Sequence, residues 1–228
     1  MKKSMKNLKM KIAVVTVNFN KSQSTIGLMK SLEQSDFKDI KFYVVDNNSD
    51  PKDLNNLETE LFMSPMETKL IYNNKNEGWG MALNKAFVSI VKDGLPLTLV
   101  INNDARIQPN TISELIKTME NPMIGICGVK ILHPDGSLAT AGGRMDWFTR
   151  LTGITRENKT RHNAQETVLL NNDEFCDDCC WCIKSDILNY VQYPPYLFLY
   201  FEELWIIEGA RKLGYHIAYN PRAIVYHS

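Results

Sequence analysis

Polar residues that could do chemistry follow three apolar runs of the chain. The stretch LVINNDARIQP carries two amides and a carboxylate, residues 102–104, directly after a run expected to be buried. Asp46 ends the run FYVVD, and Asn18 and Phe19 follow the run AVVTV. Carboxylates and amides bind ligands and cations, but the same residues also form turns and cap helices. Taken singly, each cluster leaves a ligand site and turn geometry as equal alternatives.

A fourth polar cluster, NNKNEGWGMALN, contains Asn76, Gly78 and Asn84. Glycine at the start of a helix lets a ligand approach the backbone, and the free N–H groups there bind phosphate. The spacing of Gly78 and Gly80 does not match the G-x-G-x-x-G fingerprint, so the cluster does not favour a dinucleotide site.

The hydrophobic pattern predicts the elements that position these clusters. Short runs rich in β-branched residues predict buried strands, and apolar residues at helical spacing predict helices between them. The predicted strands cover residues 11–17, 40–46, 69–73, 97–102 and 123–132, and the predicted helices cover residues 22–35, 53–63, 80–94 and 109–120. Strands alternating with helices imply a parallel sheet with helices on both faces. Such sheets bind ligands beyond the carboxyl ends of their strands, where all four clusters fall, and this coincidence favours a binding site.

The pattern changes in the second half of the chain. Periodicity fades over residues 133–174, a long insertion that we assign to substrate contact. A strand at residues 179–184, a helix at 202–214 and an edge-like strand at 215–227 follow. The aromatic run YPPYLFLYF, residues 193–201, is either part of the core or the exposed surface of an interaction module.

Length and composition limit the function classes. A chain of 228 residues, 44% hydrophobic and 23% charged, is typical of one soluble globular domain. We expect a flexible lysine-rich N-terminus at residues 1–10 and one domain over residues 11–228. Lys plus Arg and Asp plus Glu both number 26, which argues against nucleic acid as a partner. No run reaches the ~20 apolar residues of a membrane span, so we expect a cytoplasmic protein.

The cysteines raise the question of a metal site. Four of the five lie in CDDCCWC, at Cys176, Cys179, Cys180 and Cys182. A structural zinc site needs pairs of ligands that converge, usually from distant parts of the chain. No second pair is present, so we expect small buried apolar side chains in a reducing compartment.

The polar clusters together resemble a known family. The motifs VVTVNFNKS, FYVVDNNSD, NEGWGMALNKAF, LVINNDARIQP and ARKLGYHIAYNPRAIVYH follow the order and spacing of family 2 glycosyltransferases with the GT-A fold. The branch they most resemble is the bacterial rhamnosyltransferase-like group. The resemblance implies an α/β fold with a Rossmann-like, mostly parallel sheet flanked by helices and a small acceptor-side subdomain. It divides the domain into a nucleotide-sugar-binding half, residues 11–131, and an acceptor and catalytic half, residues 132–228.

The resemblance also implies a donor site at the strand ends. Phe19 and Asp46 would flank the nucleobase, with the Asp46 carboxylate accepting a hydrogen bond from the pyrimidine ring N–H. The residues implied to bind the nucleotide sugar are Asn18, Phe19, Asp46, Asn76, Gly78, Asn84, Asn102 and Asn103.

Two residues are implied to bind a divalent cation. Asp104 falls at the place of the family's D-x-D motif and would bind Mg²⁺ or Mn²⁺, with His227 as the second protein contact. A bridging cation stabilises the charge on a departing diphosphate. One carboxylate, one histidine and the diphosphate are enough ligands for such a cation.

Inverting transfer also needs a general base for the acceptor hydroxyl. The family supplies it from a Glu-Asp pair at the start of the late helix. Here the pair is Glu202-Glu203, and Glu203 stands at the place of the aspartate. The alternative role for Glu203 is a solvated helix-start residue that interacts with the helix dipole.

The acceptor side departs from the family pattern more than the donor side. The departures are Asp178-Cys179 for a Gly-Ala pair, Pro194-Pro195 for an Asp-Glu pair, Trp205 for an acidic residue and Gly209 for a helix arginine. Two functions therefore stay open. One is inverting sugar transfer to an acceptor hydroxyl in bacterial surface polysaccharide or glycoconjugate synthesis. The other is a catalytically impaired domain that binds nucleotide sugar or serves as an interaction module.

The resemblance implies partners as well. The donor would be a UDP-, dTDP- or GDP-linked sugar, and the acceptor a saccharide or a lipid-linked saccharide. A lipid-linked acceptor implies peripheral attachment to the inner face of the cell membrane, as the alternative to a freely cytoplasmic protein.

Overall fold

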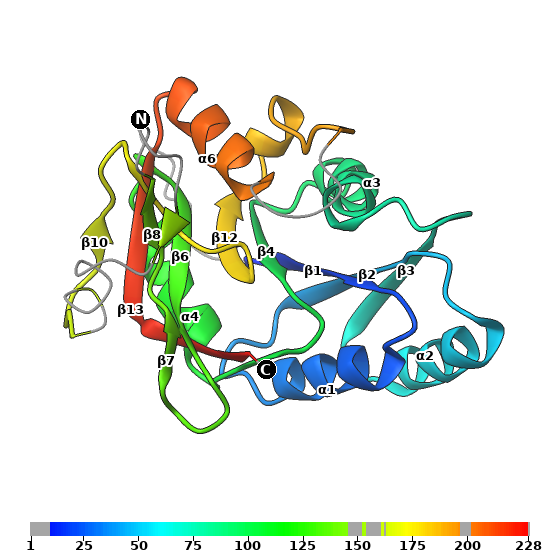
Figure 1. Ribbon diagram of the computed structural model, residues 1–228. Helices are drawn as coiled ribbons and strands as arrows, with labels where there is room; N and C mark the ends of the chain where they lie inside the picture. Colours follow the sequence, from blue (N-terminus) through cyan, green and yellow to red (C-terminus); the bar gives the residue numbers. More distant parts are fainter. Residues whose placement is uncertain (1–9, 146–151, 154–160, 162, 197–201, 228) are drawn as a thin grey trace, which may run out of the picture.

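A mostly parallel sheet lies between two layers of helices (Figure 1). The computed structural model describes residues 10–145, 152–153, 161, 163–196 and 202–227. The first half contributes four parallel strands in the spatial order β3-β2-β1-β4. These strands are β1 (Ile12–Asn18), β2 (Ile40–Asp46), β3 (Glu67–Tyr72) and β4 (Leu97–Ile101). Every residue of β1 and β4 is buried, which explains why their sequences are mostly apolar and β-branched.

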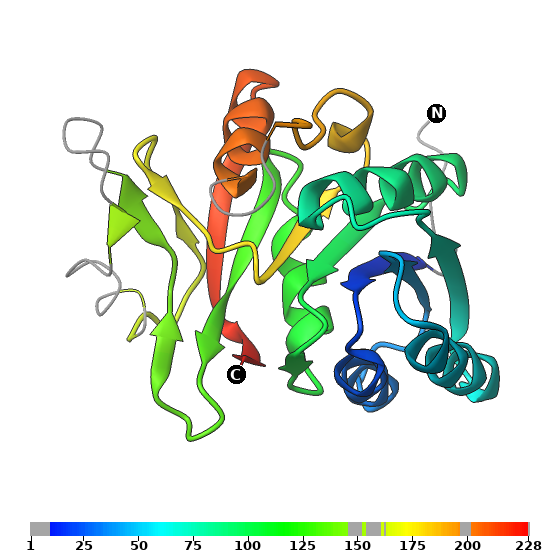
Figure 2. The same cartoon turned by 45° about the vertical axis from the view of Figure 1, so that its right-hand side comes forward.

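Helices cover both faces of the sheet and build a separate core on each face (Figure 2). Helices α1, α2 and α4 pack on one face, whereas α3, α6 and the short 3₁₀ helix η1 pack on the other. Their bounds are α1 (Ser22–Glu33), α2 (Pro51–Met63), α3 (Trp79–Lys92), α4 (Thr111–Met119), η1 (Ile187–Asn189) and α6 (Glu202–Lys212). The predicted α/β class is confirmed, and each predicted helix differs from the observed one by no more than two residues at either end.

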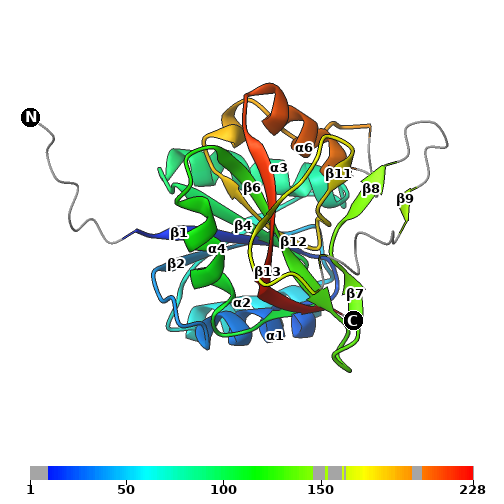
Figure 3. The same cartoon turned by 90° about the vertical axis from the view of Figure 1, so that its left-hand side faces the viewer.

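The second half extends the same sheet and mixes its directions (Figure 3). Strand β12 (Cys180–Lys184) runs antiparallel between β4 and β6 (Ile124–Leu132). Strand β13 (His216–His227) then lies parallel to β6. The end of β13 also pairs antiparallel with the short strand β5 (Ala105–Ile107), which directly follows the NND stretch.

The prediction that residues 215–227 form an edge-like strand is wrong. Strand β13 lies between β6 and the two-residue strand β10 (Val168–Leu169), so it is flanked on both sides over part of its length. Its central residues Ile217, Ala218, Tyr219 and Asn220 are all buried. A sequence pattern cannot reveal this position, because the covering strand belongs to a segment without periodicity.

The segment 133–174 contains more regular structure than its composition predicts. Besides β10, it holds β7 (Leu138–Thr140), β8 (Gly143–Met145) and β9 (Thr152–Gly153), and β11 (Glu174–Phe175) closes it. Strands β11, β8 and β9 form a separate small sheet. Strands of two or three residues are too short to show an alternating pattern, so the sequence does not predict them.

The cysteines are buried in the core, as expected. All five thiols are free, and Cys180 and Cys182 face the same core cluster as Cys127. Burial raises the pKa of the Cys182 thiol to about 12. No group of three His, Cys, Asp or Glu side chains able to hold a metal occurs among the described residues. The zinc interpretation therefore gains no support.

The aromatic run 193–201 is described only in part. Tyr193 is buried and stacks on Phe87, with ring centroids 5.9 Å apart. Tyr196 is exposed and meets Trp205 edge to face, at 6.2 Å between centroids. Residues 197–201 lie outside the described part of the chain.

In the described part, no helix combines the length and the apolar character that crossing a bilayer requires.

Candidate functional site

The polar clusters meet at the carboxyl edge of the sheet, where the sequence places them. Asn18 and Asp46 are register partners at the ends of β1 and β2. Residues 102–104 follow β4, the other neighbour of β1. Three of the four clusters are thus brought together by direct strand pairing.

The buried side chain of Asn18 connects the loops at this edge by hydrogen bonds. Its side chain is fully buried and donates to Asp46 Oδ1, Ser49 Oγ and Asp53 Oδ2, each at 3.0 Å. Its side-chain oxygen, Oδ1, accepts a hydrogen bond from Thr25 Oγ1 at 2.8 Å. All polar atoms of the Asn18 amide are engaged by protein groups, so this residue positions its neighbours.

Asp53 is a member of this network that the sequence did not single out. Its Oδ1 accepts the backbone N–H of Ser22 at 2.9 Å, where α1 begins. Burial opposes ionisation, but the hydrogen bonds from Asn18 and Ser22 prevail and lower the pKa of Asp53. The carboxylate therefore joins the starts of α1 and α2 beneath the strand ends.

Asp46 is held in one orientation. The carboxylate is 2% exposed, and its Oδ2 accepts the backbone N–H of Ser49 at 3.0 Å. Phe19, in the loop after β1, has 43% of its surface exposed. The buried carboxylate and the open aromatic ring thus offer a hydrogen-bond acceptor and a stacking surface at the same edge.

Turn geometry accounts for part of the polarity in these loops. Asn20 and Asn48 adopt left-handed backbone conformations, with φ of 52° and 69°. Asparagine tolerates this region better than other non-glycine residues. The Asn20 side chain accepts the backbone N–H of Asp50 at 2.7 Å, which ties the two loops together. Turn geometry is therefore realised at Asn20 and Asn48, within the same motifs.

Asn47 connects the strand ends to the fourth cluster, a role that the sequence analysis missed. Its Nδ2 donates to Asn76 Oδ1 at 2.8 Å and to the Gly78 carbonyl at 3.3 Å. Its Oδ1 accepts from Asn73 Nδ2 and from the Glu77 backbone N–H. The loop before α3 is therefore fixed against β2.

Gly78 and Asn84 have distinct roles in and near α3. Gly78 precedes the helix with φ of 81°, a conformation that favours glycine. Asn84 exchanges two hydrogen bonds with the Tyr193 backbone, at 2.8 Å to its carbonyl and 3.0 Å from its N–H. Asn84 thus ties α3 to the segment that contains Pro194-Pro195.

Asp104 and His227 form the clearest pair at the site. His227 Nε2 lies 3.0 Å from Asp104 Oδ1 and 3.4 Å from Asn102 Nδ2. The pairing of His227 with Ala105 across β13 and β5 creates this contact. Their mutual hydrogen bond is the main cause of both pKa shifts, lowering the pKa of Asp104 and raising the pKa of His227.

A chain of side-chain hydrogen bonds joins Asn103, the neighbour of Asp104 in the sequence, to Asp46. Asn103 Nδ2 donates to Thr25 Oγ1 at 3.1 Å, and Thr25 in turn donates to Asn18. On the other side, Arg106 donates to the main-chain carbonyls of Asn103 and Ala105. The NND stretch is therefore held between α1 and β5, with its Asp104 side chain 44% exposed.

The donor atoms fit a small divalent cation. A carboxylate oxygen and an imidazole nitrogen, both partly exposed, can share a cation whose remaining positions are filled by ligand oxygens and water. Among the described residues no third such side chain joins them. The pair thus fits an open site that a bound phosphate completes, and does not fit a closed structural site.

Helix α6 carries the predicted base. The Glu203 side chain is partly buried. Burial, then Cys127 and Asp177, raise the pKa of the Cys176 thiol, and the Glu203 carboxylate adds to this shift. Trp205 is half exposed. Only the backbone of Glu202 falls within the description. The structure therefore places Glu203 near the segment 176–177 that leads into β12.

The departure at Gly209 on α6 has a structural cause, and Arg211, two residues later, has a structural role. A side chain at Gly209 would collide with Val191, because a Cβ there would lie 2.3 Å from Val191 Cγ1. The Arg211 guanidinium donates to the carbonyls of Asn171, Asn172 and Glu174. Arg211 thus fastens α6 to the turn before β11.

The cavity bounded by Met10, Pro96, Lys184 and Tyr215 lies at the opposite edge of the sheet. It measures about 670 Å³. Two of its polar side chains are paired, since Lys184 donates to the Pro122 carbonyl and the Tyr215 hydroxyl donates to Asp186. This cavity is therefore separate from the polar clusters.

Comparison with known sequences gives one match. The sequence model of the family described as glycosyl transferase family 2 matches residues 13–191. No curated protein matches the chain.

Solved structures share the architecture at low sequence identity. PcManGT, a mannosyltransferase from Pyrobaculum calidifontis in complex with GDP-Man and Mn²⁺, has a TM-score of 0.70 at 14% identity, over 95% of this chain and 56% of that chain. GalNAc-T7 with UDP, GalNAc and Mn²⁺ has a TM-score of 0.74 at 15% identity, over 96% and 43%. S. aureus TarS 1–349 in complex with UDP has a TM-score of 0.71 at 18% identity, over 95% and 60%. The chain spans about half the length of these proteins, and the likeness establishes the GT-A fold.

Proposed function

Because the chain belongs to glycosyl transferase family 2, we propose that it transfers a sugar from a nucleoside-diphosphate sugar to an acceptor hydroxyl, with inversion at the anomeric carbon. The observation that carries this proposal is the Asp104–His227 pair, held at the carboxyl edge of the sheet. The residue before Asp104, Asn103, is linked to Asp46 by side-chain hydrogen bonds through Thr25 and Asn18.

Asp46 and Phe19 bind the nucleobase in this proposal. The Asp46 carboxylate is oriented by Asn18 and Ser49, so a free lone pair can accept the ring N–H of a uracil, thymine or guanine base. The exposed Phe19 ring packs against the base. Asn76, Gly78, Asn102 and Asn103 line the path from the base to the metal pair, while Asn18 and Asn84 act through the groups that they hold.

Asp104 and His227 hold Mg²⁺ or Mn²⁺ in the proposal. A bound divalent cation supplies positive charge beside the diphosphate as the glycosidic bond breaks. His227 binds a metal only when its imidazole is neutral. Asp104 would bind the cation through its ionised carboxylate.

Glu203 acts as the general base, with Glu202 beside it. The Glu203 carboxylate takes the proton from the acceptor hydroxyl while the hydroxyl oxygen forms a bond to the anomeric carbon. The bond from that carbon to the diphosphate oxygen breaks on the opposite face, and its electrons leave with the diphosphate. A partly buried position beside Leu204 suits a carboxylate that must stay ionised yet basic.

The finer assignments follow from the sequence motifs. We propose a rhamnosyltransferase-like enzyme that uses a UDP-, dTDP- or GDP-linked sugar in bacterial surface polysaccharide or glycoconjugate synthesis. Residues 11–131 form its donor half and residues 132–228 its acceptor half. A lipid-linked acceptor would bring this cytoplasmic domain to the inner face of the membrane.

Calorimetric titration with UDP, dTDP, GDP and CDP tests the donor half. Each nucleotide is titrated with Mn²⁺ and again with excess chelator, and the sugar donors of the best nucleotide are then tested for transfer. Metal-dependent binding of one nucleotide, followed by transfer, supports the proposal. Binding without transfer supports the catalytically impaired domain, and no binding at all overturns both in favour of an interaction module.

A further inference from the structure

Strand β13 contains a break in register just before the metal pair. Asn220 pairs with Val129 of β6, but Ile224 pairs with the next residue, Lys130. Three residues of β13 therefore bulge out between two neighbouring positions of β6. Without the bulge, uniform pairing would place Arg222 opposite Ile131 in the core, a position that Val225 occupies instead.

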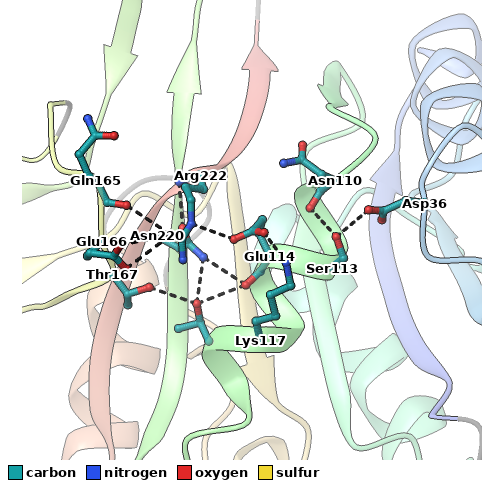
Figure 4. Close-up of polar contacts among 11 residues, drawn as sticks. Asp36, Asn110, Ser113, Glu114, Lys117, Gln165, Glu166, Thr167, Asn220 and Arg222 are labelled. Atoms are coloured by element: carbon teal, nitrogen blue, oxygen red, sulfur yellow. Dashed lines mark hydrogen bonds and ion pairs between the residues drawn. The ribbon is translucent and has the colours of Figure 1, made fainter.

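The buried side-chain amide of Asn220 stabilises the bulge on its core side. The fully buried Asn220 side chain donates from Nδ2 to the Glu114 carbonyl at 3.1 Å and to Thr118 Oγ1 at 2.9 Å, both on α4. Its Oδ1 accepts the backbone N–H of Arg222 at 2.9 Å. One side chain thus satisfies the bulged backbone and anchors it to a helix (Figure 4).

The half-exposed side chain of Arg222 stabilises the bulge on its solvent side. Its Nε donates to Glu114 Oε2 at 3.0 Å, while Lys117 Nζ donates to the other oxygen, Oε1, at 2.6 Å (Figure 4). The guanidinium also reaches the Glu166 carboxylate at 3.4 Å, in the segment before β10. Arg222 therefore joins the bulge to α4 and to the insertion, whereas Lys117 contacts Glu114 from the helix itself.

Hydrogen bonds attach the residues after the bulge to β5 and to the loop that follows it. The Ile224 carbonyl accepts the backbone N–H of Gln108 at 3.1 Å and Thr111 Oγ1 at 2.6 Å. Val225, Tyr226 and His227 then pair with β5. The register chosen at the bulge thus decides which residue meets Asp104.

We propose that Asn220 and Arg222 are positioning residues that set the register of β13 so that His227 faces Asp104. A bulge re-aims the strand that follows it, and these two side chains give the bulge one conformation. The role assigned to His227 as a metal contact rests on the proposed function. The placement of His227 by the bulge does not.

Mn²⁺ affinity and backbone hydrogen exchange test the proposal together. Arg222→Gln changes a half-exposed side chain and keeps its three methylene-position carbons and a polar end while removing the charged guanidinium, so the variant is expected to fold. Asn220→Ala is the stronger change. Lys117→Gln is the matched control, because it removes the other ion pair of Glu114 without touching the bulge.

We expect Arg222→Gln to weaken Mn²⁺ binding about tenfold, the usual effect of losing a group that orients a ligand. In the metal-free protein it should speed exchange of the amides at 224–227 and 105–107, with β1 and β2 unchanged. Lys117→Gln should alter neither quantity.

Wild-type Mn²⁺ affinity together with wild-type exchange in Arg222→Gln overturns the positioning role, as does an equal loss of affinity in Lys117→Gln. If the unaltered protein binds no Mn²⁺, the metal role of the proposed function fails. The exchange measurement then still decides whether the bulge sets the register of His227.

Discussion

His227 Nε2 lies 3.0 Å from Asp104 Oδ1, although the two residues belong to opposite halves of the chain. Each residue shifts the pKa of the other in the direction that favours the charged form, lowering that of Asp104 and raising that of His227. The lowered pKa of Asp104 means that its contribution to stability is present above the ordinary value of 3.8 and is lost as the pH falls through the folded value. The raised pKa of His227 means that its contribution is complete below 6.5 and is lost as the pH rises through the folded value. The metal-free pair thus stabilises the fold in mildly acidic solution.

Asp104→Ala is predicted to remove metal-dependent donor binding. The variant keeps His227 but loses the carboxylate oxygen that a hard cation prefers. Calorimetry should show that nucleotide affinity in Mn²⁺ equals the value measured with chelator. Asp186→Ala, which removes a carboxylate at the opposite edge of the sheet, is the control and should behave as the unaltered protein does. Full metal-dependent affinity in Asp104→Ala would falsify the metal assignment.

Glu203→Gln is predicted to spare donor binding and stop transfer. The amide has nearly the same shape but does not accept a proton, so we expect kcat to fall at least about 100-fold while the nucleotide Kd stays the same. Steady-state transfer assays and calorimetry measure the two quantities. Glu208→Gln changes another partly exposed glutamate of α6 and should leave kcat unaltered. If Glu203→Gln retains normal kcat, the general base is a different residue.

Asn84→Ala is predicted to destabilise the fold. The change leaves the buried backbone carbonyl and N–H of Tyr193 without their partners, which costs about 2 kcal/mol of unfolding free energy. Urea denaturation measures the loss. Val88→Ala, an exposed position on the same helix, is the control and should stay within about 0.5 kcal/mol of the unaltered protein. Equal stability of both variants would show that the Asn84 tie is dispensable.

Asp93→Asn is predicted to change the acid dependence of stability. Hydrogen bonds from Tyr43 and Lys41 lower the pKa of Asp93 to about 2. A lowered pKa gives a contribution that is present above 3.8 and is lost as the pH falls toward 2. The variant should therefore lose about 1 kcal/mol at pH 7, a value reduced for solvent screening, and less in acid. Urea denaturation at neutral and acidic pH measures the difference, and one that does not shrink in acid would contradict this origin.

The strand-and-helix order and the gathering of the polar clusters at one edge were predictable because their causes are local or topological. Continuous apolar runs such as Ile12 to Val15 specify buried strands, and the spacing of apolar residues in the helices specifies their inner faces. Parallel strands then bring their carboxyl ends to one edge, so Asn18, Asp46 and the NND stretch could be placed together without coordinates.

The tertiary structure alone decided which groups each polar residue contacts. The side chains of Asn18 and Asn84, predicted to bind the nucleotide sugar, make hydrogen bonds to Asp46 and to Tyr193, and those partners lie far away in the sequence. The interior place of β13 depends on β10, and the meeting of His227 with Asp104 depends on a bulge closed by Asn220. A hydrogen-bond partner or a strand register is a relation between distant segments, and no local pattern encodes it.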